Sequence, residues 1–420
     1  MTPPHINKAV PDASQFYTLS KPAIGTVLNT NQETPKLFEP LTLRGVTFKN
    51  RIWVAPMCQY CADDGHTTDW HLVHYGSYAT HGVGAVTVEA TAVVSEGRIS
   101  PEDSGLWKDS QIAPLKRITS FVHAHDTKIG IQLAHSGRKA STHAPWVQRK
   151  AGKGASAVAT KEENGWPEKV YAPSEISFHP GAYPDPQAAP EEYINELIDA
   201  FVAATKRADE ADFDFIELHT AHGYLLHEFL SPLSNTRTDI YGGQPLENRM
   251  RLLLQIVEKV RAAWPSHKPL FVRISATDWA EGPEKDETGK WLQWGIEQST
   301  ILSQRLQELG VDFIDCSTGG LWQAQKIPVG PGYQVPFAAH LKKSLPNLPV
   351  GTVGMITEPE QAESYLQEGK ADVILMAREF LRNPAWPMYA AHKLGVKIKA
   401  PNQYEMGWLG PVPTTTTPRV

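Results

Sequence analysis

The sequence has few cysteines and lacks the two common glycine-rich nucleotide-binding motifs. Only Cys58, Cys61 and Cys316 occur in 420 residues, so any disulfide scheme leaves one thiol unpaired. A chain of this length folds without such crosslinks, and a reducing, intracellular setting is expected. Neither GxGxxG nor GxxxxGKS/T occurs in the sequence, which argues against a doubly wound dinucleotide-binding sheet.

Long apolar runs and excess positive charge are also absent. No stretch approaches the length of a membrane span, and the N-terminal segment has no continuous apolar core of the kind found in signal peptides, because it is broken by Pro3, Pro4, Pro11 and Pro22. The 40 Lys and Arg residues are scattered and are opposed by 46 Asp and Glu. The sequence therefore predicts a cytoplasmic protein that binds neither membranes nor nucleic acid.

Short runs rich in Val, Ile and Phe alternate with stretches of helical spacing, the pattern of parallel strands joined by helices. Eight runs are present, at Arg51–Met57, Ala85–Val94, Lys128–Ala134, Phe213–His219, Leu270–Ser275, Val311–Cys316, Leu348–Gly354 and Ala371–Met376. Helices are expected between them, for example at Pro190–Ala211, Glu247–Trp264 and Thr357–Gly369. This alternation predicts an α/β fold, a (β/α)8 TIM barrel, with the doubly wound sheet as the rival.

Three segments fall outside the repeat. The barrel is expected to span 37–400, between an N-terminal extension at 1–36 and a C-terminal tail at 401–420 that is rich in Pro and Thr. A long loop, Ser141–Ala189, follows the third strand and begins close to Gln132 and Lys139. Loops of this length in compact folds are commonly lids or binding loops, so we expect it to border a functional site.

Polar side chains follow several of the predicted strands, where burial costs free energy unless the group is paired or used. These residues are Cys58, Gln132, His219, His222 and Arg273. A barrel brings the ends of its strands to one rim, so one polar site is predicted there. The last two strands close on Gly354 and on Ala377-Arg378, where barrels commonly bind phosphate.

His219 closes a strand and His222 follows three residues later, a separation that lets a turn aim both rings at one point. Two imidazoles can then donate hydrogen bonds to one oxygen on which negative charge develops. Tyr224 can deliver a proton, because a phenol with an unperturbed pKa of about 10 stays protonated at neutral pH. The alternatives are satisfied core histidines or a metal site, as in a metal-dependent barrel hydrolase, which needs a third ligand.

Cys58 and Cys61 have CxxC spacing, which fits zinc, a redox dithiol or an iron-sulfur cluster, but no second pair completes a four-cysteine site. A single useful thiol at Cys58 is therefore preferred. Arg273 must meet an anion, because a guanidinium does not lose its charge. That anion is either a bound ring or an internal carboxylate such as Glu89 or Glu217.

The sequence resembles the Old Yellow Enzyme family of FMN-dependent ene-reductases over residues 37–408, and most of all its thermophilic-like branch. That branch carries a Cys and a Tyr after the first strand, as in Ala55-Pro-Met-Cys-Gln-Tyr60, and a His-His pair in place of His-Asn. The run HGYLLHEFLSPLSNTRTDIYGGQPLENR at 222–249 is highly specific to these barrels. The resemblance implies FMN as the cofactor, NADPH or NADH as the reductant, and activated alkenes as small-molecule substrates.

The resemblance also implies a role for each matching residue. The flavin ring is expected to be held by Ala55, Pro56, Met57, Cys58, Ala90, Gln132 and Arg273, and the FMN phosphate by Gly354, Ala377 and Arg378. Arg273 is expected near N1, Gln132 at the pyrimidine edge, and Cys58 by N5, where it tunes the potential. In catalysis, the carbonyl or nitro oxygen is expected to bind His219 and His222, Tyr60 to position the alkene, and Tyr224 to protonate Cα. No metal is expected.

Two positions depart from the family pattern. Position 377 is Ala where many relatives have Gly, a change that is tolerated if only the backbone N–H is used. Met406 stands where this branch often has an Arg that reaches into a neighbouring subunit's pocket, so a homodimer is expected to lack that contact. The sequence leaves open the physiological alkene, the stereochemistry, the preference between NADH and NADPH, the oligomeric state, and what the N-terminal extension and the 141–189 loop add.

Overall fold

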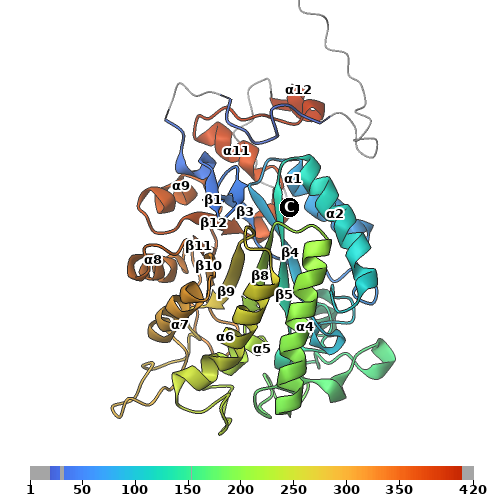
Figure 1. Cartoon of the computed structure of the whole chain (residues 1–420), viewed down its shortest axis with the longest axis vertical. Coiled ribbons are helices and arrows are strands. Elements are labelled where there is room, and N and C mark those ends of the chain that lie inside the picture. The colour runs from blue at the N-terminus through green and yellow to red at the C-terminus, as the bar shows by residue number, and fades with distance from the viewer. Residues whose placement is uncertain (1–18, 29–32, 153, 409–420) are drawn as a thin grey trace, which may run out of the picture.

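The computed structural model describes residues 19–28, 33–152 and 154–408, and its centre is a closed barrel of eight parallel strands (Figure 1). In order around the barrel these are β3 (Ile52–Val54), β4 (Ala85–Ala92), β5 (Lys128–Ala134), β8 (Phe215–Thr220), β9 (Leu270–Ser275), β10 (Phe313–Ser317), β11 (Val350–Thr352) and β12 (Val373–Met376). All eight predicted strands are present, and the predicted TIM barrel is confirmed. The barrel closes where β12 pairs with β3.

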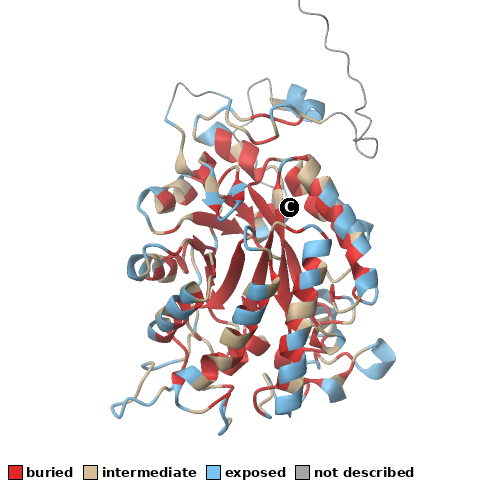
Figure 2. Ribbon diagram, viewed as in Figure 1, coloured by how far each residue is buried: buried red, intermediate tan, exposed pale blue. Residues whose placement is uncertain are grey.

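Helices surround the barrel, and most of them bury one face towards the strands (Figure 2). They are α1 (Asp69–Ala79), α2 (Ile112–Ala124), α3 (Pro145–Ala151), α4 (Glu191–Glu210), α5 (Leu225–Leu230), α6 (Leu246–Ala263), α7 (Ile296–Glu308), α8 (Val335–Ser344), α9 (Pro359–Gln367), α10 (Arg378–Arg382), α11 (Trp386–Lys393) and α12 (Glu405–Trp408). In α4 the buried residues Ile194, Leu197, Ile198 and Phe201 follow helical spacing. The three helices predicted by range are present as α4, α6 and α9.

An antiparallel hairpin covers the amino-terminal end of the barrel. Its strands, β1 (Leu41–Leu43) and β2 (Val46–Phe48), are absent from the sequence prediction, because three residues are too few to show an alternation. Phe48 is fully buried, and its ring centroid lies 4.3 Å from that of Trp53 and 5.9 Å from that of Phe215. The hairpin therefore closes this end with aromatic contacts.

The inward-facing residues change character along the strands. Every second residue of a strand faces the barrel interior. On β8, β9 and β10 these residues form three layers. The layer at the amino-terminal end is Phe215, Phe271 and Phe313, the middle layer is Glu217, Arg273 and Asp315, and the layer at the carboxyl end is His219, Ser275 and Ser317. The three phenylalanines pack with Phe48 and Trp53, and we call these five residues the aromatic plug. Because the plug fills the amino-terminal end, the polar groups gather at the carboxyl end, where barrels place their sites.

Phe271→Ala is expected to lower the free energy of unfolding by about 3–5 kcal/mol, because the cavity it leaves is surrounded by rings that cannot fill it. The ring centroid of Phe271 lies 4.5 Å from that of Phe215, 4.8 Å from that of Phe313 and 5.7 Å from that of Trp53. Val73→Ala on α1 is the control, since Val73 is 70% exposed, and we expect a change of about 0.5 kcal/mol or less. Urea unfolding followed by circular dichroism compares them; equal stabilities would contradict the role of the plug.

The described part of the N-terminal extension packs on a segment near the other end of the chain. Val27 forms an antiparallel bridge with Ile398, and the Gly25 N–H donates to the Lys399 carbonyl oxygen at 2.8 Å. Ile24 is buried in a small cluster with Met388 and Ala400. In Figure 1 this segment lies at the top of the molecule, beside α12. The outer parts of the predicted extension and tail, 1–18 and 409–420, lie outside the described residues.

The long loop after β5 has secondary structure of its own. It carries α3 and a two-stranded parallel pair, β6 (Tyr171–Ala172) and β7 (Gln187–Ala188). Backbone hydrogen bonds connect different parts of the loop, for example from the Ala159 N–H to the Ser141 carbonyl oxygen at 2.8 Å. It is therefore an ordered element placed beside the barrel.

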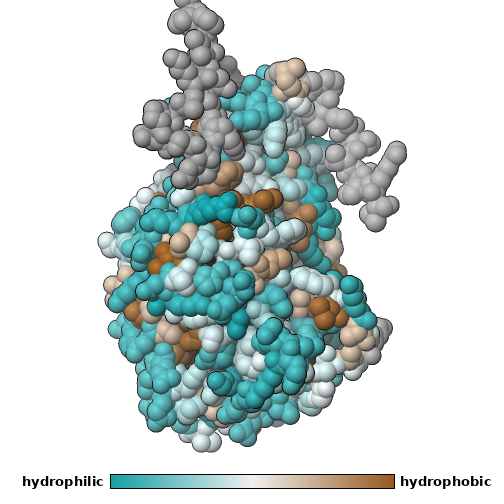
Figure 3. Space-filling model, turned by 90° about the vertical axis from the view of Figure 1, so that its right-hand side faces the viewer, coloured by the Kyte–Doolittle hydropathy of each residue, from teal (hydrophilic) through white to brown (hydrophobic). Residues whose placement is uncertain are grey.

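Among the described residues, no helix has both the length and the apolar character that crossing a membrane requires. The face of the molecule in Figure 3 is mostly hydrophilic, and its hydrophobic residues occur in small groups.

Candidate active site

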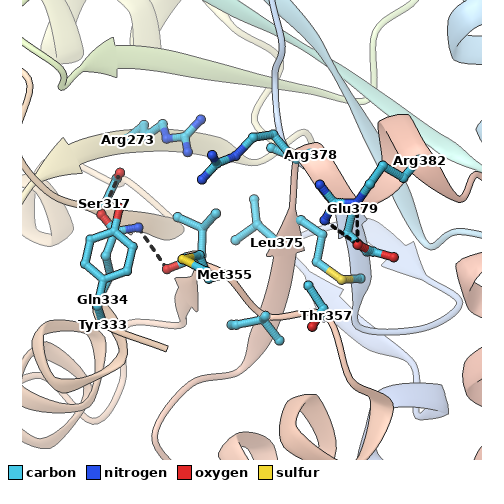
Figure 4. A pocket seen from close by; sticks show the side chains of 15 residues that line it. Arg273, Ser317, Tyr333, Gln334, Met355, Thr357, Leu375, Arg378, Glu379 and Arg382 are labelled. Carbon is cyan, nitrogen blue, oxygen red and sulfur yellow. Dashed lines mark hydrogen bonds and ion pairs between the residues drawn. The ribbon is translucent and has the colours of Figure 1, made fainter. Parts of the chain in front are cut away.

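A cavity of about 280 Å³ lies at the carboxyl ends of β9 to β12 (Figure 4). Side chains from β9, β10 and β12 and from the segments after β11 and β12 line it. Four of the residues predicted to bind the cofactor are among them, namely Arg273, Gly354, Ala377 and Arg378. The structure thus brings together positions that are more than 100 residues apart in the sequence.

The cavity suits an anionic group. Arg382 is paired with Glu379 at 2.5 Å, whereas the Arg378 guanidinium has no hydrogen bond or ion pair with any described residue. Gly354 has a φ of 129°, and a Cβ there would lie 3.0 Å from Nε2 of Gln334. A glycine at this point leaves the backbone open to a close ligand. Cationic side chains and open backbone together fit the phosphate of FMN.

Part of the set predicted to hold the flavin ring lies beside this cavity. The Ala55 N–H donates to the Met376 carbonyl oxygen at 2.9 Å, so the segment 55–58 starts next to the cavity wall. A bulge in β4 sets Glu89 and Ala90 opposite Gln132 of β5. A bulge re-aims side chains where it occurs, and here it lies at a position predicted to contact the ring. The ring-binding candidates therefore share one end of the barrel.

Arg273 forms an ion pair inside the barrel, with 3.1 Å between its Nε and Oδ2 of Asp315. The two carboxylates considered from the sequence are not its partners, because Glu217 accepts a hydrogen bond from Gln132 at 2.7 Å and Glu89 accepts one from Tyr75. An internal carboxylate was thus the right type of partner, but the residue differs. The terminal N–H groups of Arg273 make no hydrogen bond with any described residue and stay available to a ligand.

The two predicted histidines come together at the rim. The ring centroids of His219 and His222 are 5.2 Å apart, and the rings meet at 76°. Burial, strengthened by the charge of Arg273, holds the pKa of both imidazoles well below its usual range. Both rings are therefore neutral at pH 7, and each carries one N–H. Nδ1 of His219 is buried without a hydrogen-bond partner among the described residues.

The turn that carries His222 is fixed from two sides. Its backbone is left-handed, with a φ of 61°, and its N–H donates to Oγ of Ser275 at 3.0 Å. Nζ of Lys139 donates to the carbonyl oxygen of His222 at 2.8 Å and also to that of Gly320. Burial lowers the pKa of Lys139 to about 7. Sequence reasoning assigned Lys139 no role, although a lysine in the short segment that follows a buried strand was a signal that it contacts the rim.

Tyr224 lies beside the histidines, with 5.0 Å between its ring centroid and that of His219. It immediately precedes α5, in extended backbone. Burial raises the pKa of the Tyr224 phenol well above its ordinary value. The phenol is therefore protonated throughout the neutral range and is available as a donor.

The long loop supplies one side of the site. Trp146 of α3 places its ring 5.5 Å from that of Tyr60, almost perpendicular at 87°. Phe178 of the same loop lies under Nζ of Lys139, 4.1 Å from its ring centroid. The expectation that this loop borders the site agrees with these contacts, and Trp146 and Phe178 are lining residues that the sequence did not single out.

Cys58 is a neutral thiol. Burial raises its pKa well above the usual range, and the nearby carboxyls of Asp103 and Glu89 act in the same direction. A protonated thiol is a poor nucleophile and a poor metal ligand. All three cysteines are free. Across 19–28, 33–152 and 154–408, no three His, Cys, Asp or Glu side chains are placed to hold a metal ion.

Comparison with known proteins identifies the class. The sequence model of the NADH:flavin oxidoreductase / NADH oxidase family matches residues 36–396. The chain is 46% identical over 411 residues to an NADH:flavin oxidoreductase of Gibberella zeae, covering 96% of each protein. It is 45% identical over 376 residues to an NADPH dehydrogenase of Halalkalibacterium halodurans, covering 89% of this chain and 99% of that one.

Solved structures share the barrel. Morphinone reductase matches with a TM-score of 0.67 at 24% identity, covering 88% of this chain and 92% of that one. A 2-naphthoyl-CoA reductase complex matches with a TM-score of 0.73 at 22% identity, covering 85% of this chain but 52% of the other, about half its length. At such identities the likeness supports the fold and not a shared substrate.

Barrel, cavity and relatives together define a flavin-dependent oxidoreductase. The chain belongs to the NADH:flavin oxidoreductase / NADH oxidase family, which is the Old Yellow Enzyme family that the sequence resembles. It is an FMN-dependent enzyme with NADPH or NADH as the reductant. Its place in the thermophilic-like branch stays a prediction.

Arg378→Ala is expected to weaken FMN binding more than Arg382→Ala. Glu379 already neutralises Arg382, whereas Arg378 has no such partner and contributes the larger attraction to a phosphate. A hydrogen bond to a charged group contributes about 1.5–3 kcal/mol, so the Kd for FMN should rise about ten- to a hundredfold in Arg378→Ala. Quenching of FMN fluorescence by added apoprotein measures both constants. A larger effect of Arg382→Ala would place the phosphate elsewhere.

Proposed function

We propose that this enzyme reduces the activated C=C bond of α,β-unsaturated carbonyl or nitro compounds. The observation that carries the proposal is a pair of neutral imidazoles beside a protonated phenol, at the rim of an arginine-lined cavity that fits FMN. Hydrogen-bond donors grouped in this way suit an oxygen that gains negative charge during reaction. The substrates are therefore alkenes that carry such an oxygen in conjugation.

The residues around the cavity are suited to hold FMN, which supplies the hydride after reduction by NAD(P)H. The ring would be held by Ala55, Pro56, Met57, Cys58, Ala90, Gln132 and Arg273, and the phosphate by Gly354, Ala377 and Arg378. The free N–H groups of Arg273 favour an electron-rich edge of the ring. The thiol of Cys58 is neutral, so it would act on the flavin through a weak dipole and would change the reduction potential of the ring slightly.

His219 and His222 bind the substrate oxygen. A neutral imidazole donates one hydrogen bond, and a donor already in place stabilises developing negative charge by about 2.7–4 kcal/mol. Because both rings are buried and neutral, they polarise the oxygen without forming a tight ion pair with it. Tyr60, whose ring contacts that of Trp146, positions the alkene.

Tyr224 supplies the proton to Cα. Its phenol lies beside His219, and its raised pKa keeps the proton in place until the neighbouring carbon has become basic. The direction of the pKa shift determines how the rate depends on pH. Because the pKa of Tyr224 is raised above the ordinary value of about 10, Tyr224 keeps its proton up to about pH 9.

Purified holoenzyme is expected to bleach under NADPH without oxygen and to regain its yellow colour when cyclohex-2-enone is added. In His219→Ala, recolouring by the enone should slow about 10²- to 10³-fold, because one donor to the oxygen is lost. Bleaching by NADPH should change much less. Stopped-flow absorbance follows both half-reactions. Wild-type enzyme that bleaches but is not recoloured by enones or nitroalkenes would refute the proposed substrate class.

Tyr224→Phe is expected to slow recolouring by enone about 10²- to 10⁴-fold, the contribution of a positioned general acid. The affinity for the enone should stay the same, since the phenyl ring keeps its contact with His219. Ionisation of Tyr224 should contribute nothing to the pH dependence of recolouring between pH 6 and pH 9. A rate that falls in wild type but not in Tyr224→Phe over that range would show that the phenol ionises there, against the raised pKa.

Several features stay predictions. They are the cytoplasmic location, the small-molecule alkene that serves as the physiological substrate, and a homodimer whose subunits do not share an active site through Met406. Met406 lies on α12 and is 84% exposed. The domain limits at 36 and 400 are likewise proposals.

A further inference from the structure

Gln334, which lines the FMN cavity, has its amide held in one orientation. Nε2 lies 2.9 Å from the carbonyl oxygen of Val353, which can only accept, so Nε2 donates there (Figure 4). The amide oxygen Oε1 therefore faces two hydroxyls, Thr318 Oγ1 at 2.7 Å and Ser317 Oγ at 3.2 Å. Thr318 satisfies this oxygen by donating its proton to it.

Ser317 lies between two partners and has one proton to donate. Its Oγ is 3.2 Å from Oε1 of Gln334 and 2.8 Å from Nε2 of His222. If Ser317 donates to Gln334, the imidazole must donate from Nε2. If Ser317 donates to Nε2, that nitrogen must be unprotonated. The direction of one hydroxyl is therefore coupled to the position of the proton on His222.

The imidazole of His222 holds a single proton. It is kept neutral by burial, with the charges of Arg273, His219 and Lys139 acting in the same direction. Since Ser317 contacts Nε2, the nitrogen left for a ligand is Nδ1. With the proton on Nδ1 the ring donates to a carbonyl oxygen, and with the proton on Nε2 it can only accept.

We propose that Ser317 is a positioning residue that sets the tautomer of His222 to match the ligand. Its hydroxyl turns towards Nε2 when the ligand accepts a hydrogen bond and towards Gln334 when the ligand donates one. This inference rests on the proposed function, in which the acceptor is the substrate oxygen. Thr318 lowers the free-energy cost of rotating the Ser317 hydroxyl, because Oε1 of Gln334 keeps one hydrogen-bond donor in both arrangements.

Two variants at position 317 test the proposal in the FMN-loaded protein. Cyclohex-2-enone is the probe, since its carbonyl can only accept. Ser317→Ala removes the hydroxyl and is expected to raise the Kd of the enone about tenfold, because the enone-bound ring then buries an unprotonated Nε2 that has no donor. Ser317→Thr keeps a hydroxyl and should bind within about twofold of wild type. The change in flavin absorbance on enone binding gives each Kd, and flavin content and circular dichroism show that each variant is folded.

NMR spectroscopy measures the tautomer of His222 directly, without enzyme turnover. In protein labelled with ¹⁵N at histidine, the His222 signals, assigned by their loss in His222→Gln, distinguish a proton on Nδ1 from one on Nε2. Thr318→Val leaves Gln334 with Ser317 as its remaining hydroxyl donor, so the ligand-free ring should shift towards the Nε2 tautomer. Thr318→Ser should leave the tautomer as in the wild type, because it keeps the hydroxyl.

The outcomes separate this inference from the proposed function. If Thr318→Val shifts the tautomer signals but the enzyme does not reduce enones, the proposed substrate class is wrong and the role of Ser317 stands. Unchanged tautomer signals in Thr318→Val, together with an unchanged Kd in Ser317→Ala, would overturn the role of Ser317 even if enones are reduced. A Ser317→Thr variant as weak as Ser317→Ala would also overturn it, since the hydroxyl would then not be the cause.

Discussion

The buried charge of Arg273 determines the chemistry of the groups around it. A guanidinium keeps its proton in any protein environment, so its burial requires a nearby anion, and Asp315 on the adjacent strand provides one. Burial lowers the pKa of His219 and His222, and the positive charge of Arg273 acts in the same direction, so the rim carries neutral donors instead of imidazolium ions. The same guanidinium faces the cavity that fits FMN. One side chain therefore links cofactor binding to the state of the groups that meet the substrate.

That charge can be held in position because of what lies beneath it. Phe271 precedes Arg273 by two residues on the same strand and packs in the aromatic plug, so the strand has little freedom to shift. Above it, the left-handed turn at His222 is tied to the barrel by Ser275 and to the segment after β5 by Lys139. The donors at the rim are thus fixed by packing below and by hydrogen bonds to backbone beside them, which is what preorganisation requires.

Sequence reasoning succeeded where the information is local. Each barrel strand is an apolar run of its own, and polar residues at strand ends must converge once the strands form a barrel. The hairpin of β1 and β2 was missed because its strands are too short to carry a pattern. The partner of Arg273 was missed because choosing Asp315 over Glu217 requires the register between strands. Ser317 and Gln334 meet only through the fold, and nothing in their neighbourhood in the sequence marks the contact. The individual roles came from family resemblance and not from spacing.

The side of the site formed by Trp146 and Phe178 belongs to an inserted loop and not to a barrel strand. Loop length changes stability slowly, by about 0.6 kcal/mol for each doubling, and a change within the loop leaves the strand register untouched. Evolution can therefore vary the shape of this side independently of the redox centre. Such modularity lets one hydride-transfer apparatus be matched to new molecules by altering a segment that contributes no residue to the arginine-lined cavity.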